Sequence, residues 1–427
     1  MREEYLLALL MLGLVAAFEI VTRNHPKWWA PALLLAAVAG SLAAGMGLRF
    51  REIVEGPFGF LDALLPCMVG MVFLRMLKDN GAWDALLVRL VGKSPLASSF
   101  GALLFLALPG MLTGFAAASV LMSAGPVYAY LREKGADKAK TVGFITVGAF
   151  LGMMLPPNCA PAIVAANGAG SVLPTPYVGF FLPLLVLALP AFLAFGILSA
   201  PLFKGKETVA QKGSLLPMLP LIAVSALMLV EGLLGSYVYV GGQVVIFLAG
   251  ILLAALFPVT RRGVKAAMET LLQGVVDLAV PVAAVLALGS FIEVSSMNGI
   301  RGIFSYHILP YTNGDATYAV MLALMALSLI AGLFLSAPLP AFFIAYAVFP
   351  IGWLANTVIV TGCAAAVGVA CLIALRGGVF SRTKEALQLT DVTYRQVLPQ
   401  LILPAMLVTI MGVIMVILGD KMTGLIL

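Results

Sequence analysis

The stretch that most constrains this chain runs from Gly143 to Gly170, GFITVGAFLGMMLPPNCAPAIVAANGAG. It is as apolar as a membrane-spanning helix and exceeds the roughly 20 residues that such a helix needs. However, it carries Pro156, Pro157 and Asn158 near its centre. Proline removes a backbone donor and clashes with the preceding turn, so the sequence predicts a broken span. In a membrane, the backbone groups freed by a break persist only where they line a cavity or hold a ligand.

The composition places this broken span in a membrane. Of the 427 residues, 62% are hydrophobic and 10% are charged, which is typical of an integral membrane protein. The net charge of +6 comes from cations in short loops between apolar runs, so we interpret it as a signal of membrane orientation and expect no nucleic-acid partner. Continuous apolar segments near the required length fall at 5–22, 30–48, 58–77, 178–200, 215–234, 238–257, 271–293 and 399–418.

Two further apolar blocks are interrupted near their centres. Residues 96–131 are interrupted at 109–114, and residues 317–353 are interrupted at 336–340. Each block is long enough for two half-depth helices joined by a tight turn, so we interpret both as re-entrant hairpins with no net crossing. With that layout, most of the 25 lysines and arginines fall on one side of the membrane. That side is predicted to be cytoplasmic, which places both termini outside.

Short motifs recur along the chain at an offset of about 220 residues. The run DALLP at 62–66 returns as DLAVP at 277–281, and the Asn-Gly pair at 80–81 returns at 298–299. Each unit consists of a span, a hairpin, a broken span and a closing span, which makes three net crossings. Because two helices separate the units, the second is expected to be inverted relative to the first. Inverted repeats with discontinuous helices are typical of secondary transporters.

With both units in view, the chain resembles the ion transporter superfamily, and within it the large membrane subunit of TRAP-type transporters. These import carboxylates with a periplasmic binding protein. The likeness covers nearly the whole chain. It is most specific in the hairpin from Thr113 to Pro126 and from Gly148 to the Pro-Pro-Asn break at 156–158, which are similar to the family's small-residue hairpin and Pro-Pro-Ser break. The second hairpin also resembles its counterpart.

The resemblance implies an elevator-type mechanism, in which a transport domain of two hairpins and two broken helices slides against a scaffold, driven by sodium. It also implies a small four-helix membrane subunit and a periplasmic substrate-binding protein as partners, in the cytoplasmic (inner) membrane of a bacterium or archaeon. The chain departs from the family at 235–243, where a Thr-Pro-Thr-Glu-Ala motif is missing, and at 374–378, where the second break lacks prolines. A homodimer and a stand-alone carboxylate symporter or antiporter therefore remain alternatives.

The expected fold class is an all-α polytopic membrane protein with two inverted repeats and an elevator-type division into scaffold and transport domain. Each repeat begins with a scaffold helix and ends with a closing helix. The expected regions are N-terminal scaffold helices at 1–57; a first repeat at 58–200, with its hairpin at 96–131 and its broken helix at 141–168; a linker and two scaffold helices at 201–264; and a second repeat at 265–427, with its hairpin at 317–353 and its broken helix at 357–380.

An arginine in the second broken span is the clearest substrate-binding candidate. Aligning the repeats places Arg376 opposite Pro156. An arginine within an apolar segment is costly unless it meets an anion or water, and its planar guanidinium suits a carboxylate. The alternative is that Arg376 extends to the cytoplasmic surface at the helix end. The expected substrate-binding residues are Arg376, Gly377, Gly378, Asn158, Pro157 and Ser336.

The hairpin tips are the expected cation site. Hydroxyl groups and freed backbone carbonyls suit a hard cation such as sodium. The expected ligands are Thr113, Gly114, Ser119, Ser123 and Pro156. Small and hydroxyl-bearing residues also let helices pack closely in lipid, and that is the alternative role for each of them taken singly.

The sequence thus predicts a secondary active transporter of a small organic anion of the carboxylate class, coupled to sodium and without a cofactor. No Gly-rich phosphate loop, metal cluster or nucleophile–base pair is visible in the sequence, so we expect no enzymatic activity. An intramembrane enzyme acting on lipid is a competing class, and it should show clustered acids or histidines at one interface. A channel or scaffold subunit is another, and it would not need two matching breaks.

Overall fold

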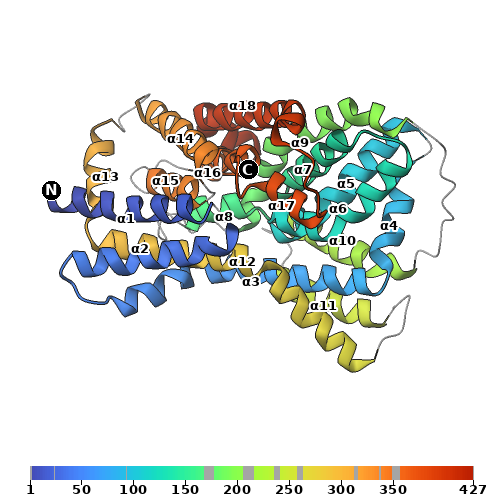
Figure 1. The fold of residues 1–427 in the computed structure, drawn as a ribbon, viewed down its shortest axis with the longest axis horizontal. Coiled ribbons are helices and arrows are strands. Elements are labelled where there is room, and N and C mark those ends of the chain that lie inside the picture. The colour runs from blue at the N-terminus through green and yellow to red at the C-terminus, as the bar shows by residue number, and fades with distance from the viewer. Residues whose placement is uncertain are drawn as a thin grey trace.

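The computed structural model of the chain describes residues 2–23, 25–92, 94–167, 177–204, 216–234, 241–256, 263–311, 316–335, 338–348 and 356–426. Over these residues the regular structure is helical, apart from one isolated β-bridge (Figure 1). The α-helices are α1 Arg2–Val21, α2 Trp29–Ala43, α3 Phe50–Asp79, α4 Ala82–Leu90, α5 Pro95–Thr113, α6 Ala116–Glu133, α7 Lys138–Met154, α8 Ala160–Asn167, α9 Phe181–Ser199, α10 Leu219–Leu234, α11 Gly242–Leu256, α12 Val264–Met297, α13 Ile300–Ile308, α14 Ala316–Phe334, α15 Pro338–Val348, α16 Thr357–Ile373, α17 Val379–Ala386 and α18 Tyr394–Ile426.

Eight helical segments among the described residues are long and apolar enough to cross a membrane. They are Glu3–Val21, Phe50–Asp79, Pro95–Thr113, Phe181–Phe203, Leu216–Leu234, Lys265–Met297, Thr317–Phe334 and Tyr394–Thr423. The prediction of an all-α polytopic membrane protein is confirmed. The span expected at 30–48 is shorter than predicted, because α2 ends at Ala43 and is followed by Gly45 and Gly47 in the left-handed conformation, each with φ of 68°.

The order of the helices repeats along the chain, and so do most of their lengths, although the second hairpin arms α6 and α15 have 18 and 11 described residues. The long helices α3 and α12 both end at an Asn-Gly pair, and Gly81 and Gly299 both have φ of 77°, a conformation that suits glycine. In each copy there follow a nine-residue helix (α4, α13), a 19-residue first hairpin arm (α5, α14), a 17-residue helix (α7, α16) and an eight-residue helix (α8, α17). These matched lengths support a duplicated unit. The inversion of the second copy and the domain boundaries stay predictions.

The first hairpin consists of α5 and α6, which pack against each other. Its turn falls at Gly114 and Phe115, while Pro109 lies inside α5. The arms are 19 and 18 residues long. At a rise of 1.5 Å per residue they reach about 28 Å, which is close to the thickness of a bilayer core. They are longer than the half-depth arms expected, because α5 continues through Pro109 to Thr113 and α6 continues beyond its apolar run to Glu133.

The two breaks lie in the interior of the molecule. In Figure 1, α8, α15, α16 and α17 occupy the middle, between α1, α2, α3 and α12 on one side and α14 and α18 on the other. The helices α3 and α12 cross closely, since a Cβ on Gly56 would lie 2.4 Å from the carbonyl oxygen of Gly289. Arg75 of α3 also pairs with Asp277 of α12, with 3.3 Å between Nη1 and Oδ2. The close crossing and the ion pair hold α3 and α12 together beside the two breaks.

Candidate functional site

The first break, between α7 and α8, is joined by hydrogen bonds to the tip of the first hairpin. The backbone N–H of Asn158 donates to the carbonyl of Met111, and that of Ala160 donates to the carbonyl of Gly114, both at 3.0 Å. The side-chain Nδ2 of Asn158 donates to the carbonyl of Leu112 at 2.7 Å. Backbone groups freed at the break therefore find hydrogen-bond partners at the C-terminal end of α5. The hairpin tip and the break form one structural unit.

Glycine is required at the turn of this hairpin. Gly114 has φ of 74°, in the left-handed region. A Cβ there would lie 3.0 Å from the backbone nitrogen of Ala160 and 3.2 Å from that of Cys159. The absence of a side chain thus allows the hairpin tip to approach the broken helix closely enough to form the β-bridge between Gly114 and Cys159.

Asn158 retains an unused acceptor at this junction. The residue is fully buried, and its Oδ1 has no hydrogen-bond partner among the described residues. The helices α5 and α7 both end here, and the C-terminal end of a helix carries partial negative charge. Pro156 and Pro157 contribute carbonyls but no N–H groups. A loop rich in acceptors beside two helix C-termini is suited to a cation.

The hydroxyl groups expected near the tip are all buried and already hydrogen-bonded. Thr113 Oγ1 donates to a carbonyl of its own helix at 2.7 Å, and Ser119 Oγ accepts from the N–H of Gly110 at 2.9 Å. Ser123 Oγ donates to the carbonyl of Phe105 at 2.9 Å, which connects α6 to α5 away from the tip. Thr113 and Ser119 still have free lone pairs at the tip, whereas Ser123 holds the arms of the hairpin together.

The second break, between α16 and α17, has a different construction. Gly377 has φ of 70°, and a Cβ on Gly378 would lie 2.6 Å from the carbonyl oxygen of Cys371. Both positions therefore favour glycine. The hydroxyl of Tyr394 donates to the carbonyl of Ile373 at 2.8 Å, which satisfies one of the last carbonyls of α16. Glycines and a tyrosine thus replace the proline pair of the first break.

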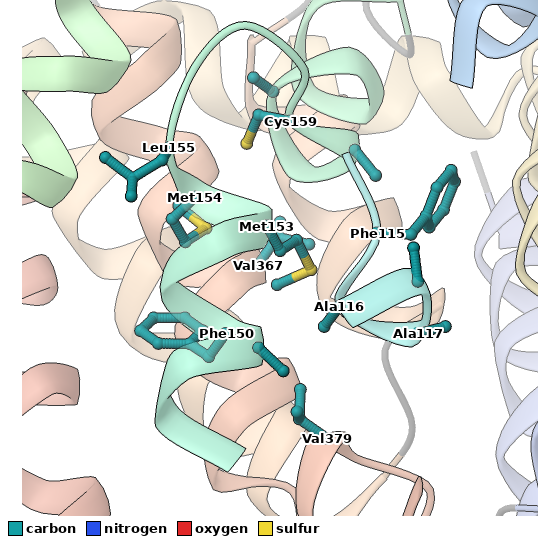
Figure 2. Close-up of a cluster of buried hydrophobic side chains, with 14 of the residues drawn as sticks. Phe115, Ala116, Ala117, Phe150, Met153, Met154, Leu155, Cys159, Val367 and Val379 are labelled. Atoms are coloured by element: carbon teal, nitrogen blue, oxygen red, sulfur yellow. The ribbon is translucent and has the colours of Figure 1, made fainter. Parts of the chain in front are cut away.

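A cavity of about 110 Å³ lies where both breaks and both hairpins meet. Its walls come from the first residues of α6, α8, α15 and α17, from α7 and α16, from one face of α12 and from Trp29. Figure 2 shows Phe115, Met153, Val367 and Val379, which belong to four separate parts of the chain, grouped in this region. Elements distant in the sequence therefore line one mostly apolar space.

In the described part of the chain, four helices begin at this cavity. Ala116, Ala160, Pro338 and Val379 are the first residues of α6, α8, α15 and α17, and each of them lines the cavity. The N-terminal end of a helix carries the equivalent of about half a positive charge. Four such ends directed at one small space produce a positive potential, and this arrangement favours an anion.

The predicted arginine lies outside the cavity, and another arginine lines it. Arg376 is exposed and is not part of the cavity wall, whereas Arg382 of α17 is. The reason is local, because Arg376 precedes the turn at Gly377, while Arg382 follows Gly378 by four residues and shares its face of the helix. This spacing is the signal in the sequence that could have identified Arg382.

The other substrate candidates divide into three groups. Gly377 and Gly378 line the cavity as predicted. Asn158 and Pro157 lie in the loop joined to the hairpin and are not part of the cavity wall. Ser336 lies outside the described residues. Trp29 was not predicted, and no local motif marks it, since only the packing of α2 brings it to the cavity.

Two helical hairpins and two broken helices around a central cavity define a polytopic membrane protein with discontinuous helices. No protein-family model and no curated protein sequence matches the chain. The fold is similar to that of the YdaH transporter of Alcanivorax borkumensis, with a TM-score of 0.64 and 11% identity over 93% of this chain and 99% of that chain. It is also similar to that of MtrF of Neisseria gonorrhoeae, with a TM-score of 0.57 and 10% identity over 92% of this chain and 94% of that chain. The structure of MtrF is described as representing a class of antimetabolite efflux pumps.

Proposed function

We propose that the protein is a membrane transporter for a small organic anion. The observation that carries this proposal is the convergence of four helix N-termini and Arg382 on one cavity. A helix N-terminus stabilises a neighbouring anion by about 0.3–1 kcal/mol at exposed sites, and by up to about 2 kcal/mol where it is partly buried. An anion is therefore the solute that this space stabilises best. The likeness of fold to the YdaH transporter and to MtrF supports a transport role.

Coupling to a cation, with sodium as the candidate, is the second part of the proposal. The unpaired Oδ1 of Asn158 and the C-terminal ends of α5 and α7 lie on the hairpin side of the first break, while α8 begins at the cavity on the other side. A sodium ion in the acceptor-rich loop would hold the loop against the hairpin tip. The N-terminus of α8 would then be fixed at the cavity, so that cation binding promotes anion binding.

The proposed movement is an elevator-type sliding of the hairpins and broken helices against α3 and α12. The wall that α12 contributes consists of Pro281, Ala284, Val285 and Leu288. These apolar side chains make no directional bonds to a solute. The hairpins and broken helices could therefore slide past α12 with the solute without breaking hydrogen bonds to this wall. In contrast, the hydrogen bonds of Asn158 join the break to the hairpin, and the two would move together.

We propose further that the chain acts without additional subunits. It spans 99% of the YdaH chain, and a single chain of this extent contains both hairpins and both breaks. The arrangement with a small membrane subunit and a periplasmic binding protein is the second candidate, because the first hairpin and its break resemble those of TRAP-type transporters. The two candidates predict different results for the purified chain. It transports by itself in the first, and it needs the additional proteins in the second.

The test is uptake by the purified chain in vesicles of phosphatidylethanolamine and phosphatidylglycerol. Radiolabelled butyrate, benzoate and succinate are supplied with an inward sodium gradient, or with potassium at equal ionic strength. We expect at least one of these anions to accumulate with sodium, and a sodium ionophore to abolish the accumulation. Uptake only after addition of a binding protein would support the TRAP-like arrangement. The absence of gradient-driven uptake and of exchange for all three anions would overturn the proposed function.

A further inference from the structure

The described wall of the cavity contains one charged side chain and is otherwise mostly apolar. Among the described residues that line it, Arg382 is the only one with a formal charge, and no carboxylate or amide side chain is present. No acidic side chain in the described part of the chain forms an ion pair with Arg382, and Glu385 on the same helix is exposed. The guanidinium is therefore available to an anionic group of a solute.

Trp29 accompanies this arginine. The Cζ atom of Arg382 lies 5.1 Å from the centre of the Trp29 ring, in a cation–π contact that orients the guanidinium. Trp29 is 6% exposed, lines the cavity, and has an indole Nε1–H without a hydrogen-bond partner among the described residues. A buried N–H donor left unpaired is costly, and an anionic oxygen would satisfy it. Two donor side chains thus lie close to each other in the cavity wall.

Two of the helix N-termini at the cavity, those of α8 and α15, offer fewer hydrogen-bond donors. Pro161 lies in the first turn of α8, and Pro338 and Pro340 lie in the first turn of α15. Proline has no N–H group, so these helices supply a favourable potential but few bonds. The first turns of α6 and α17 contain no proline, and neither helix has a side-chain cap at its N-terminus. The N–H donors therefore lie at α6 and α17, and of these two helices only α17 also contributes an arginine to the cavity wall.

The size of the cavity limits the rest of the solute. A cavity of about 150 Å³ lined by aliphatic and aromatic side chains accommodates benzene. The present cavity of about 110 Å³ is smaller. By this comparison it accommodates an apolar body of about four to six non-hydrogen atoms. The rest of the described wall, which includes Val164, Val285 and Leu288, has no charged side chain that could pair with a second carboxylate.

We propose, on the basis of the transport function above, that the substrate is a small monocarboxylate with an apolar body. Its carboxylate binds the guanidinium of Arg382 and the indole N–H of Trp29, and its aliphatic or aromatic body occupies the apolar part of the cavity. Arg382 and Trp29 are then the residues that select for one negative charge. The walls formed by Ala284 and Ala341 set the length of the body.

The experiment compares transport of butyrate and benzoate with that of succinate in the same vesicles, with uncharged butyramide as a competitor. We expect transport of the two monocarboxylates, little transport of succinate, and no competition by butyramide. Arg382→Ala should raise the KM for butyrate by about tenfold or more, and Arg382→Lys should restore part of this loss. Trp29→Phe, which keeps an aromatic ring but removes the indole N–H, should raise the KM by about threefold. Arg395→Ala is the matched control, because Arg395 is exposed and lies outside the cavity.

A cavity-filling variant tests the size of the site without altering its charge. Ala284→Leu should shift the preference from benzoate towards acetate and propionate, and it remains informative if Arg382→Ala does not fold. Transport of succinate equal to that of butyrate would overturn the inference while the transport function stands. An equal KM for butyrate in the Arg382→Ala and Arg395→Ala variants would also overturn the inference and leave the transport function standing. Failure of the wild-type protein to transport any of these anions would instead overturn the proposed function.

Discussion

The side-chain amide of Asn158 donates a hydrogen bond to the carbonyl oxygen of Leu112, 2.7 Å away, and so joins a broken helix to the tip of a hairpin 46 residues earlier in the chain. The same amide leaves its Oδ1 buried and unpaired. One side chain therefore holds the junction together and offers an acceptor to a cation. These two roles can be separated by substitution.

Asn158→Ala removes both the donor and the free acceptor. We expect lower thermal stability, because the carbonyl of Leu112 loses a buried partner at a cost of about 1–3 kcal/mol. We also expect the variant to lose stabilisation by sodium, since a ligand that binds only the folded state raises the melting temperature. The measurement is thermal unfolding in sodium chloride and in choline chloride at equal ionic strength.

Asn158→Asp provides the matched comparison. It retains an acceptor oxygen but loses the N–H that donates to Leu112, so it should be destabilised while retaining a response to sodium. An alanine variant that sodium stabilises as strongly as it does the wild-type protein would contradict a role for Asn158 in cation binding.

Gly114→Ala tests the close approach of the hairpin tip to the break. The left-handed φ of 74° and the distance of 3.0 Å from a Cβ to the nitrogen of Ala160 both oppose a side chain. We expect destabilisation of about 1–3 kcal/mol from the backbone strain, together with loss of transport. Gly125→Ala in α6 is the control, because a Cβ there meets nothing within 4 Å and alanine favours the helix. Equal stability of the two variants in thermal unfolding would show that the tip tolerates a side chain.

Gly56→Ala tests the crossing of α3 and α12. The added Cβ would lie 2.4 Å from the carbonyl oxygen of Gly289, so the two helices would have to separate. We expect a loss of about 1–3 kcal/mol, the usual range for overpacking. Gly59→Ala on the same helix meets nothing within 4 Å and should not destabilise the protein. The comparison is made by thermal unfolding in detergent, and similar melting temperatures for both variants would argue against a close crossing.

The ion pair between Lys138 and Asp391 predicts a pH dependence outside the membrane-spanning helices. The hydrogen bond from Lys138, 2.6 Å from Nζ to Oδ1, is the main cause that lowers the pKa of Asp391 below its ordinary value of 3.8. A carboxylate with a lowered pKa stabilises the fold at pH values above its ordinary pKa, and this contribution disappears as the pH falls through the lowered pKa.

We therefore expect Asp391→Asn to be less stable than the wild-type protein at neutral pH, and the difference to shrink towards zero at strongly acidic pH. The effect should be small, because the pair is exposed and screened by salt. Unfolding curves from neutral to acidic pH measure it, with Lys138→Ala and the double variant completing the cycle. A difference that grows as the pH falls would contradict the assigned sign.

The sequence alone predicted the features that depend on neighbouring residues. The break at 156–158 follows from two adjacent prolines, because proline disrupts a helix wherever the chain folds. The Asn-Gly pairs that marked the repeat in the sequence stand at the ends of α3 and α12, where the left-handed conformation suits glycine. The length and apolarity of the segments predicted a polytopic helical membrane protein, because a bilayer sets both requirements.

Only the tertiary structure decided which side chains reach the cavity. The apolar context of Arg376 suggested an anion ligand, but the turn at Gly377 separates it from the cavity and places Arg382 there instead. Trp29 and the α12 wall come from parts of the chain remote from either break. Sequence periodicity specifies which residues share a helix face, but the packing of distant helices determines which face borders a common space.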